Sequence, residues 1–276
     1  MTRTLTGTTK FFGIIGDPIA QVRAPEVWNA LFELNNVDAV CVPLQVSPDR
    51  LQDFLAGCRA LKNSHGLIVT IPHKPASLAS VEHPTERASR VGAVNVIRLN
   101  DRSEWEGDIL DGVGFVNGLR SKGHDLAGKR ALVVGSGGVG TAIAFAIADA
   151  GAKEVIVADV LTERAQDLAN RISATGVEAR VGEANASGFD LVVNASPIGM
   201  KPEDPLPINC EALSPSTIVA DVVVHPRMTK LLTLASETGC FVQPGFNMMD
   251  FQLATMAEFF GFGPGDWSPE TTATLG

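Results

Sequence analysis

The chain has 276 residues, of which 45% are hydrophobic and 19% charged, and this globular composition argues against intrinsic disorder. Its net charge of −9, with no cluster of Lys and Arg, argues against nucleic-acid binding, which needs a basic surface. No apolar run approaches the roughly 18 residues of a membrane helix, and the N-terminal segment MTRTLTGTTK lacks the apolar core of a signal peptide, so we expect a cytoplasmic protein without a membrane partner.

Short apolar runs alternate with helical patterns through the first third of the chain. Apolar runs bounded by turn residues predict strands, and apolar residues spaced three and four apart predict helices. The strands are expected at Phe11–Ile15, Ala39–Leu44 and Gly66–Thr70, and the helices at Pro25–Leu34 and from Ser47 to about Leu61. The second helix is expected to have Ser47 as its N-cap and Pro48 in its first turn.

The alternation becomes more regular further along the chain. Ala93–Glu106 is expected to form two strands joined by a polar turn. The strands that follow are expected at Arg130–Val134, Glu154–Ala158, Leu191–Val193 and Ile218–Val222, and the helices at Gly112–Leu119, Val139–Ala150, Thr162–Ile172 and from about Asn247 to Phe260. This alternation predicts an α/β fold with a largely parallel sheet.

A glycine-rich motif of the form G-x-G-x-x-G joins the strand ALVV to the helix TAIAFAIADAG. Its residues are Gly135, Ser136, Gly137, Gly138, Val139 and Gly140. In a Rossmann unit the first glycine permits a tight turn, the second lets the backbone approach a pyrophosphate, and the third lets helix and strand pack closely. Because the N–H groups at the helix start bind phosphate, we interpret the motif as a dinucleotide-binding site.

Asp159 ends the next strand, 24 residues after Gly135. A carboxylate at this point accepts hydrogen bonds from the adenine ribose hydroxyls and repels a 2′-phosphate. Because the next residues are Val160 and Leu161 rather than Lys or Arg, the sequence favours NAD as the cofactor over NADP.

Eight short motifs follow one another from Gly13 to near Phe260. They are GIIGDPI at Gly13–Ile19, VTIPHK at Val69–Lys74, GAVN at Gly92–Asn95, DGVG at Asp111–Gly114, GSGGVG at Gly135–Gly140, NASPIGM at Asn194–Met200, HPRMTKLL at His225–Leu232 and GFNMMDFQ at Gly245–Gln252. Each motif alone is modest, but the ordered set is specific. In this set the chain resembles the shikimate dehydrogenase family over nearly its whole length.

The resemblance implies two domains with the active site in the cleft where they meet. The substrate-binding domain would comprise residues 1–111 plus 246–276, with the last helix returning to it, and the NAD-binding Rossmann domain would comprise residues 112–245. A cleft between domains agrees with the general preference of ligands for such crevices.

The resemblance also implies the roles of individual residues. Lys74 and Asp111 match the family's catalytic pair, which would exchange a proton with the substrate hydroxyl while hydride passes to the cofactor. Whether Lys74 alone moves the proton or Asp111 shares the transfer stays open. The matched substrate-binding positions are Thr70, Asn95 and Gln252, and the matched cofactor-binding positions include Asn194 and Gly245.

The chain departs from the family pattern where the family would bind the substrate carboxylate. Val22 and Ala24 replace two serines, and Val224 replaces a tyrosine. Each lost hydrogen bond to a charged group is worth roughly 1.5–3 kcal/mol. Arg23 is the first candidate to compensate, because a guanidinium grips a carboxylate bidentately, and His225 and Arg227 are weaker candidates. Ile68, Ile109 and Leu110 are further apolar replacements of polar family residues.

We therefore expect an NAD-dependent dehydrogenase that reversibly oxidises a ring hydroxyl of shikimate, quinate or a related cyclic hydroxy acid. The alternative is a catalytically silent, NAD-binding sensor or regulatory protein, which the altered carboxylate site motivates. The four cysteines form no C-x-x-C pair, so no metal site is expected. The protein is expected to be a monomer or a homodimer.

Overall fold

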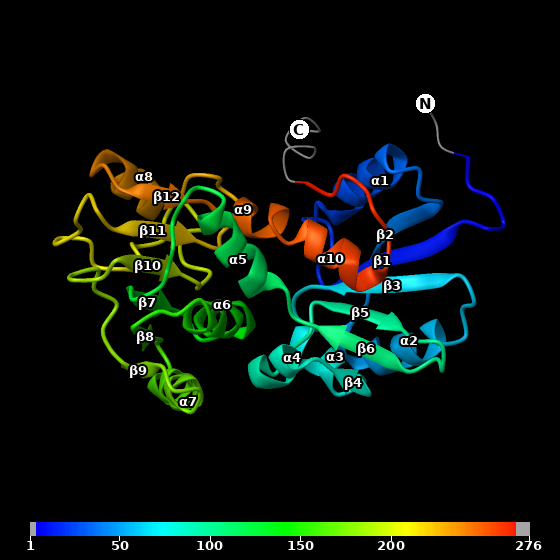
Figure 1. Ribbon diagram of the computed structural model, residues 1–276, viewed down its shortest axis with the longest axis horizontal. Helices are drawn as coiled ribbons and strands as arrows, with labels where there is room; N and C mark the ends of the chain where they lie inside the picture. The colour runs from blue at the N-terminus through cyan, green and yellow to red at the C-terminus, as the bar shows by residue number, and fades with distance from the viewer. Residues whose placement is uncertain (1–3, 269–276) are drawn as a thin grey trace. The chain divides into compact units, whose positions relative to one another are not determined.

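The computed structural model describes residues 4–268, which fold into two compact units (Figure 1). One unit consists of the residues up to Leu110 together with those from Leu253 onward, and the other is Asp111–Gln252. The α/β class and the two-domain organisation are confirmed. Residues 1–3 and 269–276 of the expected first domain lie outside the described residues.

The first unit is built on a mixed six-stranded sheet. Its strands, in the spatial order β2-β1-β3-β5-β6-β4, are Ala39–Gln45, Lys10–Gly16, Ser64–Val69, Val96–Leu99, Trp105–Asp108 and His83–Pro84. β1 pairs with β2 and β3 in parallel, whereas β5 is antiparallel to both β3 and β6. The carboxyl ends of β1 and β3 therefore lie at the same edge as the amino end of β5.

Helices on both sides of this sheet bury its core. They are α1 (Ala24–Leu34), the short 3₁₀ helix η1 (Pro48–Arg50), α2 (Leu51–Cys58), α3 (Lys74–Leu78), α4 (Glu86–Val91) and α10 (Leu253–Phe260). Phe12 of β1 is fully buried, and its ring lies 5.2 Å from that of Trp28 on α1 and 4.6 Å from that of Phe260 on α10. This aromatic cluster fixes the returning helix α10 on the sheet.

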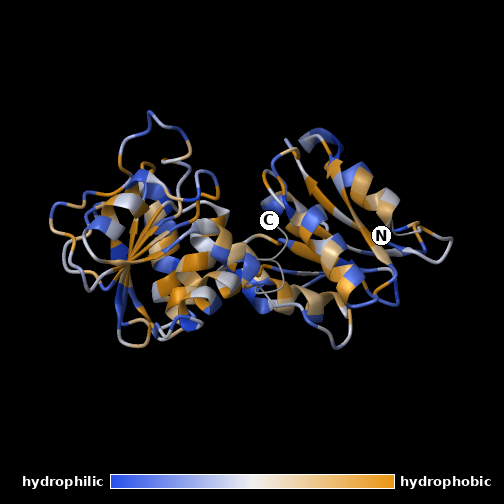
Figure 2. Ribbon diagram, turned by 90° about the horizontal axis from the view of Figure 1, so that it is seen from above, coloured by the Kyte–Doolittle hydropathy of each residue, from blue (hydrophilic) through white to orange (hydrophobic). Residues whose placement is uncertain are grey.

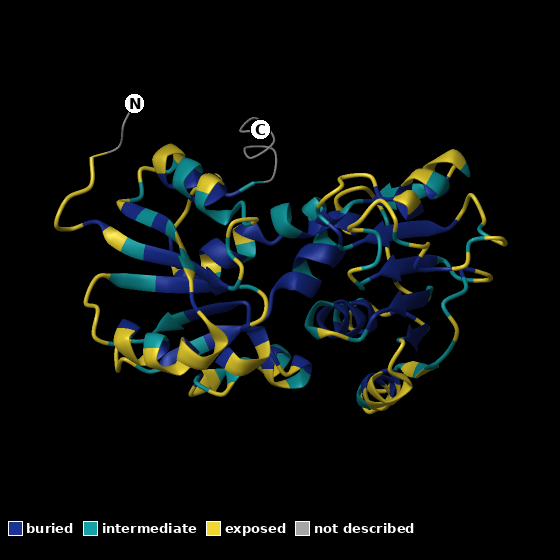
Figure 3. Ribbon diagram, turned by 180° about the vertical axis from the view of Figure 1, so that it is seen from behind, coloured by how far each residue is buried: buried dark blue, intermediate teal, exposed yellow. Residues whose placement is uncertain are grey.

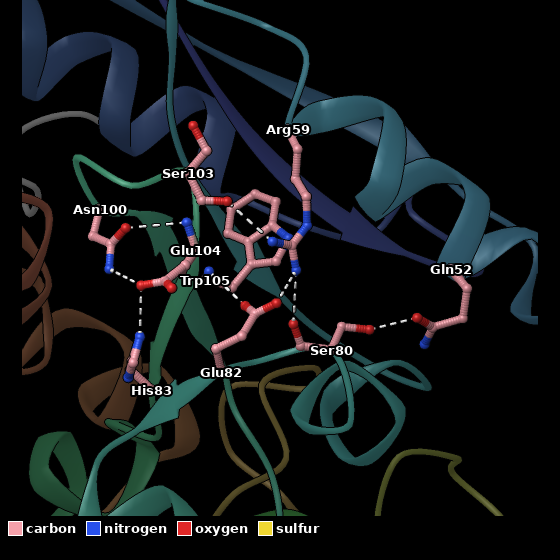
Figure 4. A network of polar contacts seen from close by, with 9 residues as sticks. All are labelled: Gln52, Arg59, Ser80, Glu82, His83, Asn100, Ser103, Glu104 and Trp105. Atoms are coloured by element: carbon pink, nitrogen blue, oxygen red, sulfur yellow. Dashed lines mark hydrogen bonds and ion pairs between the residues drawn. The ribbon is translucent and has the colours of Figure 1, made fainter.

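A network of polar side chains lies beside the turn between β5 and β6, near the β4 edge of this sheet (Figure 4). The Arg59 guanidinium donates to Glu82 Oε1 at 2.6 Å and to the Ser103 carbonyl at 3.0 Å. The second Glu82 oxygen accepts from the Trp105 N–H at 2.8 Å. The network ties α2 to the start of β6.

The second unit contains a fully parallel six-stranded sheet. Its strands, in the spatial order β12-β11-β10-β7-β8-β9, are Phe241–Gln243, Ile218–Asp221, Leu191–Asn194, Arg130–Val134, Glu154–Ala158 and Glu178–Val181. The four central strands are apolar runs buried on both faces, as parallel sheets require, and they are mostly orange in Figure 2. The strand order reverses between β7 and β10, which is the topological switch point where such sheets bind ligands.

Five helices accompany this sheet within the described residues. They are α5 (Asp111–Arg120), α6 (Gly138–Asp149), α7 (Thr162–Ser173), α8 (Lys230–Glu237) and α9 (Gly245–Asp250). α7 shows the amphipathic pattern clearly, with one buried and one exposed side (Figure 3). α5 packs closely on α6 and α9. A Cβ at Gly112 would lie 2.3 Å from the carbonyl oxygen of Ala142, and a Cβ at Gly114 would lie 2.2 Å from the carbonyl oxygen of Met248.

Several expected elements differ from those observed. The helix expected from Ser47 to about Leu61 is η1 followed by α2, and it ends at Cys58. The prediction of a single helix from about Asn247 to Phe260 is wrong, because α9 and α10 are separate helices that belong to different units. The sequence patterns missed α3, β4, α4, β9, α8 and β12, all of which are short or lie near an edge.

Candidate active site

Three predicted substrate-side residues meet at one edge of the first sheet. Thr70 directly follows β3, and its N–H donates to the Ile15 carbonyl at the end of β1. Asn95 directly precedes β5, and its carbonyl accepts from the Val69 N–H at 2.8 Å. The antiparallel pairing of β3 with β5 thus places Thr70 and Asn95 at the same edge.

Lys74 reaches the same place as the first residue of α3. Its carbonyl accepts from the Val94 N–H at 3.1 Å, which places it beside the residue that precedes Asn95. Only 8% of Lys74 is exposed, so the lysine is held inside the protein rather than at the surface. The neighbouring His73 is also buried, and its Nε2 lies 2.7 Å from the Val46 carbonyl, which makes it a packing residue.

Asn95 fixes the segment that leads to the second predicted catalytic residue. Its Oδ1 accepts from the Leu110 N–H at 2.8 Å, and Leu110 is the last residue of this stretch of the first unit. Asp111 follows as the first residue of α5 and is 3% exposed. Chain connectivity therefore places the Asp111 backbone one residue beyond the hydrogen bond made by Asn95.

The two remaining substrate-side predictions lie in different units. Arg23 is a partly exposed residue at the start of α1, in the segment that follows β1. Gln252 is buried between α9 and α10 and belongs to the second unit. A Cβ at Gly114 would lie 2.9 Å from that of Gln252, so Gln252 packs against α5, the helix that Asp111 begins.

The glycine-rich motif has the local geometry that a dinucleotide needs. Gly135 has a φ of +105°, which favours glycine, and a Cβ at Gly140 would lie only 2.0 Å from the Gly135 carbonyl oxygen. By contrast, a Cβ at Gly137 or Gly138 would meet nothing within 4 Å. The first and third glycines are thus required by packing, whereas the middle of the loop is open to a ligand at the N-terminus of α6.

Asp159 is held against this loop at the end of β8. Its Oδ2 accepts from both the N–H and the hydroxyl of Ser136 at 2.7 Å, and its Oδ1 accepts from the Leu161 N–H at 2.9 Å. Burial alone would raise the pKa of Asp159, but these hydrogen bonds and the charge of Arg164 outweigh burial and lower it. Asp159 is therefore a carboxylate at neutral pH, beside the exposed Val160.

A cavity of about 270 Å³ lies beside Ser136. Its lining includes Thr141 of α6 together with Arg164 and Arg171 of α7. The positive charges that the sequence lacks directly after Asp159 therefore occur in α7, with Arg164 in its first turn and Arg171 in its last.

The predicted cofactor residues Asn194 and Gly245 are buried at the carboxyl edge of the second sheet. The Asn194 side-chain amide donates to the Ile198 carbonyl at 2.9 Å. A Cβ at Gly245 would lie 2.5 Å from the Val222 carbonyl oxygen, so close packing requires glycine there. Both residues therefore contact the backbone of neighbouring loops at this edge of the sheet.

Sequence reasoning missed two residues at this edge, Asp221 and Thr229. Asp221 ends β11 and is 2% exposed, and Thr229 is the N-cap of α8 and is 1% exposed. A carboxylate at the end of a parallel strand and a threonine before an apolar helical pattern are the signals that could have found them.

Within residues 4–268, no group of three or more His, Cys, Asp or Glu side chains is placed to hold a metal ion. No helix in the same range is long and apolar enough to cross a membrane.

Comparison with known proteins agrees with this geometry. Residues 14–97 match the family described as shikimate dehydrogenase substrate binding domain, and residues 118–195 match shikimate / quinate 5-dehydrogenase. A relative from Rubrobacter xylanophilus named shikimate dehydrogenase (NADP(+)) is 36% identical over 90% of this chain and 89% of its own length.

Solved structures extend the similarity to the whole fold. Shikimate 5-dehydrogenase from Listeria monocytogenes, in complex with shikimate and NAD, superposes with a TM-score of 0.91 at 29% identity over 100% of this chain and 99% of that one. The 5-ketofructose reductase of Gluconobacter sp. strain CHM43 superposes with a TM-score of 0.87 at 28% identity over 97% and 98%. The chain belongs to the shikimate dehydrogenase family and is a nicotinamide-dinucleotide-dependent oxidoreductase that acts on a CH–OH group.

Proposed function

We propose that the chain uses NAD to oxidise a ring hydroxyl of shikimate, quinate or a related cyclic hydroxy acid, reversibly, to the ketone. The observation that carries the proposal is the burial of Lys74 beside Thr70 and Asn95 at one edge of the first sheet. In this proposal the first unit supplies most of the residues that bind the substrate, and the second unit binds the dinucleotide.

The reaction needs a proton acceptor and a means of holding the substrate hydroxyl. The dinucleotide supplies hydride transfer when bound. In this proposal Lys74 and Asp111 exchange the proton of the substrate hydroxyl. Thr70, Asn95 and Gln252 orient the substrate hydroxyls, and the burial of Asn95 and Gln252 strengthens their polar contacts.

The preference for NAD over NADP is proposed from the charge at the end of β8. Asp159 is ionised, and Val160 stands where a cation would neutralise a 2′-phosphate. The Listeria relative binds NAD in its crystal structure, whereas the curated relatives are named NADP(+) enzymes. The arginines of α7 are the groups that would work against this preference.

A second candidate substrate is an uncharged polyhydroxy ketone or its alcohol. Val22, Ala24 and Val224 leave three apolar side chains where the family resemblance implies hydroxyl donors to a carboxylate. One structural relative is named as a reductase of 5-ketofructose, a sugar without a carboxylate. Arg23 distinguishes the two candidate substrates, because its guanidinium would bind the carboxylate of a hydroxy acid and would not be needed for a neutral sugar.

Initial rates with a substrate panel test the proposal. We expect NADH formation from shikimate or quinate, a lower kcat/KM with NADP, and a rise in KM for the acid in the Arg23→Ala variant. Turnover of 5-ketofructose but of neither acid would favour the second candidate. No turnover of any substrate, despite NAD binding by calorimetry, would instead support the silent sensor.

A further inference from the structure

The second sheet divides the dinucleotide site into two halves. The glycine-rich loop follows β7, and Asp159 follows β8 on one side of it, where the adenosine half would bind. The nicotinamide half would then lie on the other side of the switch point, beside the loops that follow β10 and β11. A Cβ at Gly135 would lie 2.8 Å from Ala195, so the loop after β10 directly abuts the glycine-rich loop.

A buried carboxylate joins these two loops. Asn194 and Asp221 are register partners at the carboxyl ends of β10 and β11. The Asn194 amide donates to Asp221 Oδ1 at 3.1 Å, and the same oxygen accepts from the Val223 N–H at 3.0 Å. On the other side, Asn194 Oδ1 accepts from the Ser196 hydroxyl at 2.7 Å. One side-chain pair therefore holds the first turns of both loops.

Thr229 completes the connection to α8. Its hydroxyl donates to Asp221 Oδ2 at 2.8 Å and accepts from the Leu232 N–H at 3.3 Å. The cap bond stabilises the first turn of α8, and the bond to Asp221 anchors the distal end of the loop after β11. Both oxygens of Asp221 are thus bound by neutral donors. Burial raises the pKa of Asp221, although these hydrogen bonds oppose the rise.

We propose that Asp221 is a positioning residue, which holds the loops after β10 and β11 in the arrangement that binds the nicotinamide half of the dinucleotide. The proposal rests on the proposed function for the existence of a dinucleotide site. Asp221 is buried beneath the loops, so it acts through Asn194 and Thr229 and touches neither substrate nor cofactor.

Paired ligands separate this role from a general contribution to folding. NADH and ADP-ribose share the adenosine and pyrophosphate groups, and only NADH carries nicotinamide. We expect Thr229→Val to weaken NADH binding by about 10-fold, the equivalent of one hydrogen bond to a buried charge, and to leave ADP-ribose binding unchanged in calorimetry. Thr229→Ser, which keeps the hydroxyl, should restore NADH binding.

A second substitution tests the carboxylate itself. Asp221→Asn keeps the shape of the side chain and should also weaken NADH binding while leaving ADP-ribose binding unchanged in calorimetry. Equal weakening of both ligands, or none, in folded Thr229→Val and Asp221→Asn would overturn the positioning role. Binding of neither ligand by the unaltered protein would overturn the proposed function as well, so the two failures are distinguishable.

Discussion

Burial gives the residues of the candidate site their chemical character. Lys74 and Asn95 are 8% and 2% exposed, and Asp111 is 3% exposed. Charged and polar side chains are rarely buried so deeply unless a structural or chemical role requires it. In the proposed reaction, Lys74 is therefore the residue on which we expect turnover to depend most.

Replacing Lys74 with Met tests this dependence. Met keeps the length and apolar stem but cannot exchange a proton, so we expect kcat to fall by about 10²–10⁴-fold. NADH affinity, measured by calorimetry, should change little. Lys62→Met, at an exposed lysine of the same unit, is the matched control and should keep full activity. Full activity of Lys74→Met would remove Lys74 from the reaction.

Asp159 gives a second test at the residue scale. Asp159→Asn removes the charge while keeping an acceptor for Ser136, so repulsion of a 2′-phosphate should disappear. We expect the ratio of kcat/KM for NAD to that for NADP to fall by about 10-fold, an energy of about 1.4 kcal/mol. A clear NADP preference of the unaltered protein would contradict the role given to Asp159.

The sequence suggests these residues as candidates but does not show their surroundings. The role proposed for Asp159 follows from its spacing of 24 residues from Gly135, which can be read directly from the sequence. The burial of Lys74 does not, because α3 has only five residues and shows no periodicity. Asp221 and Thr229 were missed for a related reason, since their pairing depends on a contact between residues eight positions apart across a loop.

At the scale of elements, the glycine-rich loop combines positions that packing requires with positions that stay open. Gly140 and Gly137 are the clearest pair, because both accept ordinary backbone angles but only Gly140 lacks room for a methyl group.

This pair predicts opposite effects of the same substitution. Gly140→Ala should lower the free energy of unfolding by about 1–3 kcal/mol, because a Cβ would overlap the Gly135 carbonyl. Gly137→Ala should leave stability nearly unchanged and weaken NADH binding, because the added methyl group would stand where the pyrophosphate approaches. Thermal melts and calorimetry on both variants check the prediction. Equal losses of stability in the two variants would contradict it.

The elements show where sequence patterns succeed. β7 and β8 were predicted to the residue, because continuous apolar runs between turn signals are unambiguous in a parallel sheet. The segment that forms α9 and α10 was predicted as one continuous helix, because apolar residues continue past Phe251 and Gln252. It breaks because α9 packs on α5 at Gly114 whereas α10 packs on β3 at Gly66, and no local signal reports these distant contacts.

At the scale of the whole molecule, the chain leaves its first unit at Leu110 and returns to it at Leu253. The returning segment is fixed by side chains as well as by α10. Asn35 exchanges two hydrogen bonds with the Asp266 backbone, at 2.9 and 2.7 Å. The His65 ring stacks on Phe262 with centroids 4.4 Å apart.

His65 makes the stability of this unit depend on pH. Burial lowers the pKa of His65, a hydrogen bond to the Phe260 backbone opposes this, and the charges of Lys10 and Arg98 lower it further. Because the folded pKa lies below the unfolded value of about 6.5, the unfolded chain binds more protons between these values. This contribution to stability is therefore present above about pH 6.5 and is lost as the pH falls towards the folded pKa.

Denaturant unfolding between about pH 5 and pH 7.5 measures this effect. We expect the unaltered protein to lose more stability on acidification than His65→Gln does. His83→Gln, at an exposed histidine of the same unit, is the control and should not reduce the loss. Parallel pH curves for the unaltered protein and His65→Gln would show that His65 contributes nothing.

The proposed function requires that the Lys74 ammonium and the Asp111 carboxylate act on one substrate hydroxyl. The most direct test is a crystal structure of the unaltered protein with NADH and the substrate that the substrate panel identifies. We predict both groups within about 2.6–3.2 Å of the reacting oxygen, directly or through one water. A substrate oxygen bound out of reach of both side chains would contradict the account.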